Sequence, residues 1–226
     1  MGSLIVIDGL DGSGKETQAK KLTEYLTGRG IRCRYLTFPD YEAESSALVR
    51  LYLSGALGED PADTGAYAAS SFYAMDRYVS YRTKWRADYA DENTVLIANR
   101  YTTANAVHQL SKLPREEWDA FLSWLWDYEF EKLGLPKPDL VFYLEMLPEI
   151  SRRLIEGRCR EAGAVRDIHE KDPRHLEDSY AAALYASERL GWQRIRCYDA
   201  SSKEPRSRED IFSEILSRIP AALLPR

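Results

Sequence analysis

Short apolar runs alternate with longer amphipathic segments along this chain. The runs cover Leu4–Ile7, Cys33–Phe38, Val95–Ala98, Leu140–Leu144 and Arg194–Tyr198. The first, third and fourth runs are almost continuously hydrophobic, which is typical of strands that are buried on both faces of a sheet. We therefore predict five strands, with these three in the interior.

The segments between the strands have the spacing of helices. Apolar residues recur about every three to four positions in Glu116–Lys132, Pro148–Ile155, Leu176–Leu190 and Arg208–Ile219. Strands that alternate with helices indicate an α/β fold, a mostly parallel sheet with helices on both faces. With 226 residues, no internal repeat and no long linker, the chain is most simply a single domain over residues 1–226.

The turn after the first strand carries the strongest chemical signal. It matches the phosphate-binding loop G-x-x-x-x-G-K-[ST] except at the last position, and it leads into a helix predicted over Lys15–Thr27. Glycines let the backbone approach a ligand, and the N–H groups of the loop and of the helix N-terminus then face an anion. The pattern predicts a nucleoside triphosphate site made by Gly9, Asp11, Gly12, Ser13, Gly14, Lys15, Glu16 and Thr17.

Glu16 is the departure from this motif, because its position normally carries a hydroxyl that binds Mg²⁺. A carboxylate can also bind this hard cation, although it adds negative charge beside the phosphates. We predict that Lys15 reaches the β- and γ-phosphates and that Glu16 is a candidate Mg²⁺ ligand. The alternative is a Gly-rich turn without a nucleotide, but the preceding strand and Lys15 favour the phosphate-binding loop.

The composition indicates which partners and which cellular compartment to expect. The net charge of −5 gives no broad attraction to nucleic acid or to anionic membranes, so we expect neither as a partner. Cys33, Cys159 and Cys197 are scattered and lack metal-ligand spacing, which is typical of a reducing cytoplasm. The sequence has no signal peptide and no apolar run of transmembrane length, so we expect a cytoplasmic protein.

Several segments together resemble the thymidylate kinase family. They are the phosphate-binding loop with Gln18, Asn99-Arg100-Tyr101, Pro138-Asp139-Leu140 and Asp199-Ala200-Ser201. The resemblance implies a P-loop kinase fold with a five-stranded parallel sheet, a helical lid and usually a homodimer. It also implies Mg²⁺-dependent transfer of the γ-phosphoryl of ATP to dTMP, which gives dTDP.

The resemblance assigns an acceptor phosphate site to two of the strand ends. Arg100 is the best candidate to hold the acceptor phosphate, because its guanidinium fork matches phosphate oxygens. Asn99 stands where the family has Asp. Asp40, in Phe38-Pro39-Asp40, resembles an acid that lies near the acceptor phosphate and the metal, so it is a second candidate Mg²⁺ ligand. A role for Asp40 as a turn or capping residue is equally consistent with its place after Pro39.

The base of the acceptor is assigned to aromatic and polar side chains. Tyr73, or its neighbour Phe72 if the register shifts by one, resembles the aromatic residue that stacks on thymine, and Arg77 resembles the arginine that contacts the base. Asn105 and Gln109 occupy places where the family has polar residues facing the thymine edge. Three residues depart from the family pattern and leave the choice of base open: Tyr41, Ala104 and His108.

A charged, irregular segment over residues 157–173 is the candidate lid and is predicted to be a mobile loop. Gly12 resembles the family members whose catalytic arginine lies in the lid, so Arg158 and Arg160 are its candidates. Ala200 lies in the loop that passes near adenine in the family.

Two other functions remain open at this point. One is a kinase for another nucleoside monophosphate or for a deoxynucleoside. The other is a nucleotide-binding protein without transfer activity, which is motivated by the departures at Glu16 and Asn99.

Overall fold

A five-stranded parallel sheet forms the centre of the molecule, in the order β2-β3-β1-β4-β5. The computed structural model describes residues 1–58, 60, 63–162 and 174–225. The strands are β1 (Ser3–Gly9), β2 (Arg32–Thr37), β3 (Thr94–Asn99), β4 (Leu140–Glu145) and β5 (Gln193–Arg196). All five predicted strands are confirmed, and the last one ends two residues before the predicted Tyr198.

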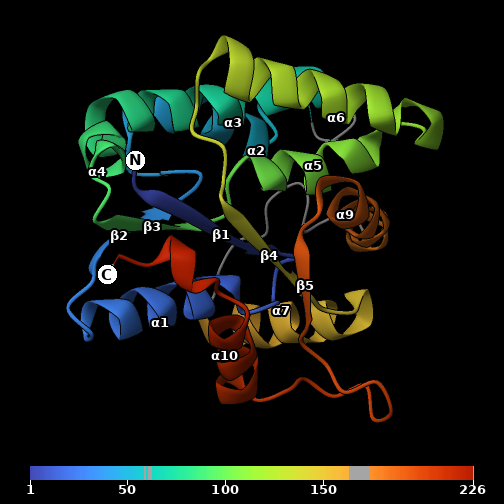
Figure 1. Ribbon diagram of the computed structural model, residues 1–226. Helices are drawn as coiled ribbons and strands as arrows, with labels where there is room; N and C mark the ends of the chain where they lie inside the picture. Colours follow the sequence, from blue (N-terminus) through green and yellow to red (C-terminus); the bar gives the residue numbers. More distant parts are fainter. Residues whose placement is uncertain (59, 61–62, 163–173, 226) are drawn as a thin grey trace.

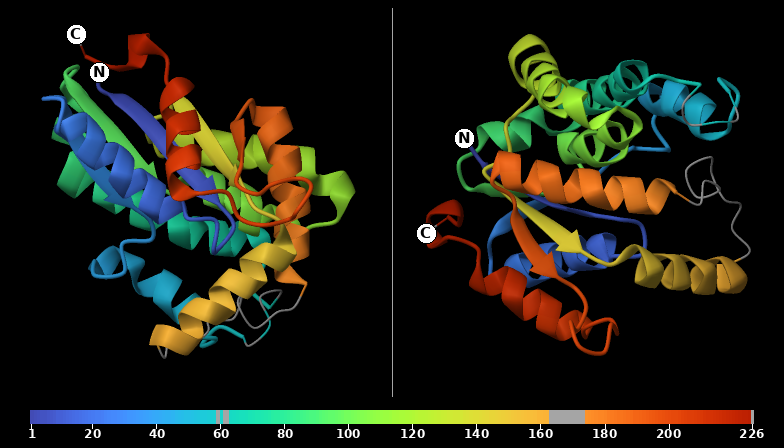
Figure 2. Two further views of the ribbon diagram at one scale, coloured as in Figure 1. Left: turned by 90° about the horizontal axis from the view of Figure 1, so that it is seen from below. Right: turned by 90° about the vertical axis from the view of Figure 1, so that its right-hand side faces the viewer.

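Helices cover both faces of this sheet (Figure 1; Figure 2). One face carries α1 (Lys15–Thr27), α7 (Pro148–Ala162) and α10 (Arg208–Ser217). The other side carries α2 (Ala47–Leu53), α3 (Ala66–Ser80), α4 (Arg86–Ala90), α5 (Thr102–His108), α6 (Trp118–Trp126) and α9 (His175–Leu190). Short 3-10 segments are η1 (Glu44–Ser46), η3 (Leu110–Lys112), η4 (Arg115–Glu117) and η6 (Ala221–Leu223). Two π-helical segments, η2 (Tyr81–Trp85) and η5 (Asp127–Lys132), continue α3 and α6. None of the described helices is long and apolar enough to cross a membrane.

Alternate residues of β1 contribute to two separate cores. Ile5 and Ile7 pack in the cluster that contains Leu22 of α1. Leu4 and Val6 pack on the opposite face, in the cluster that contains Trp85. All four side chains of the strand are fully buried, so the near-continuous hydrophobic run follows from burial on both faces.

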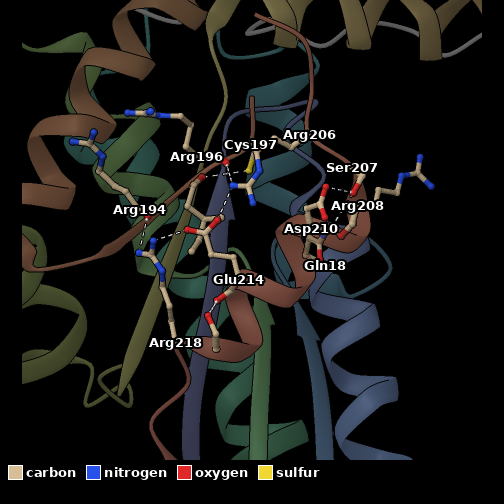
Figure 3. A network of polar contacts seen from close by, with 12 residues as sticks. Gln18, Arg194, Arg196, Cys197, Arg206, Ser207, Arg208, Asp210, Glu214 and Arg218 are labelled. Atoms are coloured by element: carbon tan, nitrogen blue, oxygen red, sulfur yellow. Dashed lines mark hydrogen bonds and ion pairs between the residues drawn. The ribbon is translucent and has the colours of Figure 1, made fainter. Parts of the chain in front are cut away.

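Polar contacts attach α10 to its neighbours (Figure 3). Ser207 caps the helix, since its Oγ accepts the backbone N–H of Asp210 at 3.0 Å. The Gln18 side chain donates to the carbonyl of Arg208 at 3.0 Å, which connects α10 to α1 behind the phosphate-binding loop. Arg206 donates to the carbonyl of Arg196 in β5 at 2.6 Å. The last helix therefore supports both the loop helix and the edge strand.

The end of α7 departs furthest from the sequence prediction. The helix predicted over Pro148–Ile155 continues to Ala162, so the prediction of an irregular segment from Gly157 onward is wrong for residues 157–162. A single Gly inside a helix costs only about 1 kcal/mol, and the Arg and Glu residues that follow it favour helix. The rest of the predicted lid, residues 163–173, lies outside the described residues.

Candidate active site

The phosphate-binding loop joins β1 to α1 at the carboxyl end of the strands, where parallel α/β sheets bind ligands. Gly12 and Gly14 have φ values of +82° and +84°, a left-handed conformation that side chains disfavour. A Cβ added at Gly12 would also lie 3.0 Å from the carbonyl oxygen of Ser151 at the start of α7. The loop therefore needs glycine at both positions, although the motif itself specifies only Gly14 of the two.

Three charged side chains meet at this loop, and we call them the Asp11 cluster: Asp11, Lys15 and Arg100. Lys15 Nζ lies 2.8 Å from Asp11 Oδ1 and donates to the Leu10 carbonyl at 3.2 Å. Arg100 Nη2 donates to the same Asp11 oxygen. One carboxylate thus accepts from cations that come from two different elements, the loop helix and the end of β3.

The charges of the Asp11 cluster support one another. Burial raises the pKa of the Asp11 carboxyl, but Arg100 and then Lys15 outweigh burial and hold that pKa well below its usual range. Burial lowers the pKa of Arg100, but the charges of Asp11 and Asp8 have a larger effect, and the net result is a raised pKa. Burial and the neighbouring Arg100 lower the pKa of Lys15. Asp11 is therefore ionised, and its charge holds the buried Lys15 and the half-buried Arg100 together.

Arg100 reaches the cluster from an unusual backbone conformation. Its φ is +64°, which is uncommon for a residue with a side chain and is often found at functional sites. Its N–H donates to the Ile7 carbonyl at 3.1 Å, so β1 fixes this turn. The turn brings the guanidinium of Arg100 from the end of β3 to the phosphate-binding loop.

A pocket adjoins the Asp11 cluster. It contains five of the predicted acceptor residues, which are Tyr73, Arg77, Arg100, Asn105 and Gln109. The other lining residues are Asp11, Phe38, Pro39, Tyr41, Leu53, Ala104, His108 and His175. The pocket thus combines three phenylalanine and tyrosine rings, two arginines and two amides, which come mainly from α3, α5 and the turns next to β2, β3 and α5.

The structure distinguishes between the two candidate aromatic residues. Tyr73 lines the pocket, and its ring meets that of Tyr52 edge-on, with centroids 6.3 Å apart. Phe72 packs against the buried cluster of Tyr52 and Ala69 and is not among the described residues that line the pocket. Of the two candidates, Tyr73 is therefore the one whose ring lines the pocket.

Arg77 is fixed by a buried partner that sequence reasoning missed. Its Nε and Nη2 donate to the two carboxylate oxygens of Glu129, at 2.7 and 2.5 Å. Glu129 also accepts from Thr102 Oγ1 and from Asn105 Nδ2, each at 3.0 Å. Arg77 and Glu129 are 1% and 0% exposed. They are 52 residues apart in the chain, and no motif connects them.

A histidine pair also lies at the pocket. His108 Nδ1 is 3.2 Å from His175 Nε2, and the two rings stack with centroids 5.3 Å apart. Ser179 Oγ lies 3.3 Å from His175 Nε2. The sequence pointed to His108 but not to His175, which opens α9 and is 67 residues away.

The two candidate metal ligands from the sequence pair with lysines that do not belong to the Asp11 cluster. Glu16 is exposed and forms an ion pair with Lys20 on the surface of α1, at 2.5 Å. Asp40 pairs with Lys84 at 2.5 Å. Neither is among the described residues that line the pocket. Asn99 is buried in β3 and donates to Thr37 Oγ1 at 3.2 Å.

The donor set indicates how Mg²⁺ could be held. Within the described residues, no three His, Cys, Asp or Glu side chains form a group that could hold a metal by themselves. Mg²⁺ in phosphotransferases usually takes one or two carboxylates together with phosphate oxygens and waters. The ionised oxygen donor of Asp11, at the phosphate-binding loop, fits a cation that arrives with the triphosphate.

The remaining predicted residues belong to α7 and to the turn after β5. Arg158 and Arg160 belong to the last turns of α7. Ala200 follows β5 in a turn where Asp199 Oδ1 accepts the backbone N–H groups of Ser201 and Ser202 at 2.9 and 2.8 Å. An ion pair of 2.9 Å between Arg153 and Glu204 joins α7 to this turn.

A phosphate-binding loop at the end of a parallel sheet, next to a second pocket with its own arginines, defines a phosphotransferase of the P-loop kinase class. Comparison with known proteins agrees: the family profile described as "Thymidylate kinase" matches residues 7–195. The chain therefore belongs to the thymidylate kinase family, and the family and fold predicted from the sequence are confirmed.

Individual relatives are similar over most of the chain. It is 29% identical over 191 residues to thymidylate kinase of Mycobacterium tuberculosis (strain H37Rv), which covers 84% of this chain and 87% of that protein. Human thymidylate kinase is 29% identical over 168 residues, with 74% and 72% covered. The structure of thymidylate kinase from Candida albicans superposes with a TM-score of 0.68 at 20% identity, over 96% of this chain and 90% of that one. This last likeness supports the fold.

Proposed function

We propose that this protein transfers the γ-phosphoryl group of ATP to dTMP, giving ADP and dTDP. The observation that carries the proposal is the Asp11 cluster, which places a loop lysine and the pocket arginine on one carboxylate oxygen. Lys15 belongs to the donor side and Arg100 to the acceptor side, so the two phosphate groups would meet where these cations meet. Membership of the thymidylate kinase family supports the same reaction.

The proposed chemistry needs positioning and charge neutralisation more than covalent help from the protein. Lys15 binds the β- and γ-phosphates, and Arg100 grips the phosphate of the acceptor with two N–H groups. An oxygen of the acceptor phosphate then bonds to the γ-phosphorus, while the bond from that phosphorus to the β,γ-bridging oxygen breaks. The phosphates of the two substrates would then take over from Asp11 as the negative partners of Lys15 and Arg100.

The pocket would hold the acceptor base. The ring of Tyr73 offers a flat surface on which a base can stack, and Arg77 and Asn105 offer polar contacts. Gln109 lines the same pocket and is a further candidate contact.

Mg²⁺ is part of the proposal, and when bound it would offset negative charge on the transferring phosphates. Asp11 is a candidate carboxylate ligand at the loop. Glu16 and Asp40 stay candidates, and each would have to leave the lysine with which it pairs.

Other parts of the proposal rest on the family resemblance. Arg158 or Arg160 would supply positive charge over the transferring phosphoryl group from the lid, and Ala200 would lie near adenine. A homodimer and a cytoplasmic location likewise stay predictions, and light scattering of the purified protein would test the dimer.

A second candidate is a kinase that prefers another nucleoside monophosphate. The observation that favours it is the presence of Tyr41, Ala104 and His108 in the lining of the pocket, all of them departures from the family pattern.

An assay of ADP release with ATP and a panel of acceptors separates these candidates. The panel contains dTMP, dUMP, dGMP, dCMP and thymidine. We expect dTMP to have the highest kcat/KM, and a higher value for another acceptor would favour the second candidate. ATP binding without turnover on any acceptor would identify a nucleotide-binding protein that lacks transfer activity.

A further inference from the structure

We propose that Glu129 determines which base the acceptor pocket takes, by fixing the directions of Arg77 and Asn105. This inference rests on the proposed function and extends it to a residue that no motif marks. Glu129 lies in the π-helical segment η5 and is not among the described residues that line the pocket. It acts through two residues that do line it, so it is a positioning residue.

Glu129 first fixes Arg77. The carboxylate accepts from Nε and Nη2 along one edge of the guanidinium, a paired geometry that leaves the plane little freedom to rotate. With that edge occupied, Arg77 has only the N–H groups of its other edge left for a ligand. Every one of these groups is a donor, because a guanidinium has no acceptor. Arg77 therefore presents only donors, and it presents them in a fixed plane.

Glu129 also fixes the amide of Asn105. Asn105 Nδ2 donates to Glu129 Oε1 at 3.0 Å and to the Ser70 carbonyl at 3.2 Å. These two contacts use both amide hydrogens, so Oδ1 is the only polar side-chain atom left for a ligand. A reversed amide would turn Oδ1 toward two oxygens that cannot donate. Asn105 therefore presents an acceptor, and Glu129 is one of the two groups that prevent the reversal.

Together the two residues select the edge of a base. A matching base presents a carbonyl oxygen to Arg77 and a ring N–H to Asn105, as the O4 and N3–H of thymine or uracil do. Cytosine has an amino group and an unprotonated ring nitrogen at the same two places. In the same orientation it would oppose donor to donor and acceptor to acceptor. Unmatched polar groups in a closed site are costly, so this arrangement discriminates strongly.

The variant Glu129→Gln tests the proposal, because it keeps the shape of the side chain and replaces one acceptor oxygen by an NH₂ donor. That donor removes one of the two groups that prevent the Asn105 amide from reversing, and it disturbs the pairing with Arg77. We expect the ratio of kcat/KM for dTMP to that for dCMP to fall by about tenfold or more. The matched control is Glu131→Gln on the same segment, where Glu131 is exposed and pairs with Lys137, and it should keep the wild-type ratio.

Removal of a buried charge can impair folding, so Glu129→Asp is the second variant. It keeps the charge but is one methylene too short to reach both partners, and we again expect the ratio to fall. A purely structural role would lower the rates with both acceptors together. A wild-type ratio in either folded variant, or a wild-type enzyme that does not prefer dTMP over dCMP, would overturn the inference. No transfer to any acceptor by the wild-type protein would instead refute the proposed function.

Discussion

At the residue scale, one carboxylate explains how the buried Lys15 and the half-buried Arg100 are held side by side. Lys15 is 8% exposed, and an unpaired charge with so little water around it would be unfavourable. Asp11 supplies the compensating charge and stays ionised because Arg100 and Lys15 hold its pKa low. A phosphate oxygen has the charge and the acceptor capacity to take over these contacts. The Asp11 cluster therefore places Lys15 and Arg100 where phosphate oxygens could replace the carboxylate.

The central role of Lys15 gives the first prediction. Lys15→Met keeps most of the side-chain volume and removes the charge that faces the β- and γ-phosphates. We expect kcat with ATP and dTMP to fall by at least about 100-fold, a loss typical of removing one group that stabilises developing charge. Lys21→Met on the same helix is the control, because Lys21 pairs with Glu209 at the surface. Equal losses in the two variants would argue against a phosphate-binding role for Lys15.

Lys112 gives a prediction about stability and pH. Its ammonium donates to Tyr52 Oη at 2.6 Å, and burial lowers its pKa from 10.5 to about 8, with Asp60 opposing the shift. Between these two pH values the unfolded chain holds a proton that the folded chain has released. Stability from this group must therefore rise as the pH increases through that window.

Urea unfolding of the wild type and of Lys112→Met measures this effect. The free energy of unfolding of the wild type minus that of the variant should increase by about 1 kcal/mol or more between pH 8 and pH 10. A constant difference across that range would contradict the assigned pKa of Lys112.

The sequence marks residues that belong to short patterns, but it does not mark the partners that fix their side chains in place. Tyr73, Arg77, Arg100 and Asn105 could be named because short patterns mark them. Glu129 could not, because its role arises from a contact across 52 residues. Its charge also gave the wrong signal, since an acidic residue in a helix is usually exposed. The contact between His108 and His175 could not be predicted for the same reason, because these residues are 67 positions apart in the chain.

At the scale of elements, the strands could be predicted well because burial on both faces leaves a clear apolar run. The end of α7 could not, because charge and Gly157 suggested a loop where the backbone continues as a helix. Charged residues on a helix that projects from the sheet need no apolar stripe, so periodicity gives little signal there. The prediction of the lid boundary failed for this reason.

The N-terminus of α10 provides a test at this scale. Ser207 Oγ accepts the N–H of Asp210, which would otherwise lack a partner in the first turn. Ser207→Ala should lower the free energy of unfolding by about 1 kcal/mol. Ser213→Ala, at an exposed position inside the same helix, should be neutral or slightly stabilising, because Ala favours helix more than Ser does. If both variants unfold alike, the cap contributes nothing to stability.

At the scale of the whole molecule, the sheet order explains why donor and acceptor sites are neighbours. The phosphate-binding loop follows β1, and Arg100 directly follows β3, the neighbouring strand. Parallel neighbours end at the same edge, so segments that lie 89 residues apart in the chain meet in the Asp11 cluster. Residues of α3 and α5 line the pocket. Both helices lie on the same side of the sheet (Figure 1).

The most direct test of this account is to follow the γ-phosphorus itself. The protein is incubated with dTMP and Mg²⁺ and with ATP labelled on that phosphorus, and the nucleotide products are then separated. The account predicts that the label appears in dTDP, in equal amount to the ADP formed, and that Arg100→Met reduces this transfer strongly. Label that appears only in inorganic phosphate, or that stays in ATP while dTMP is unchanged, would contradict it.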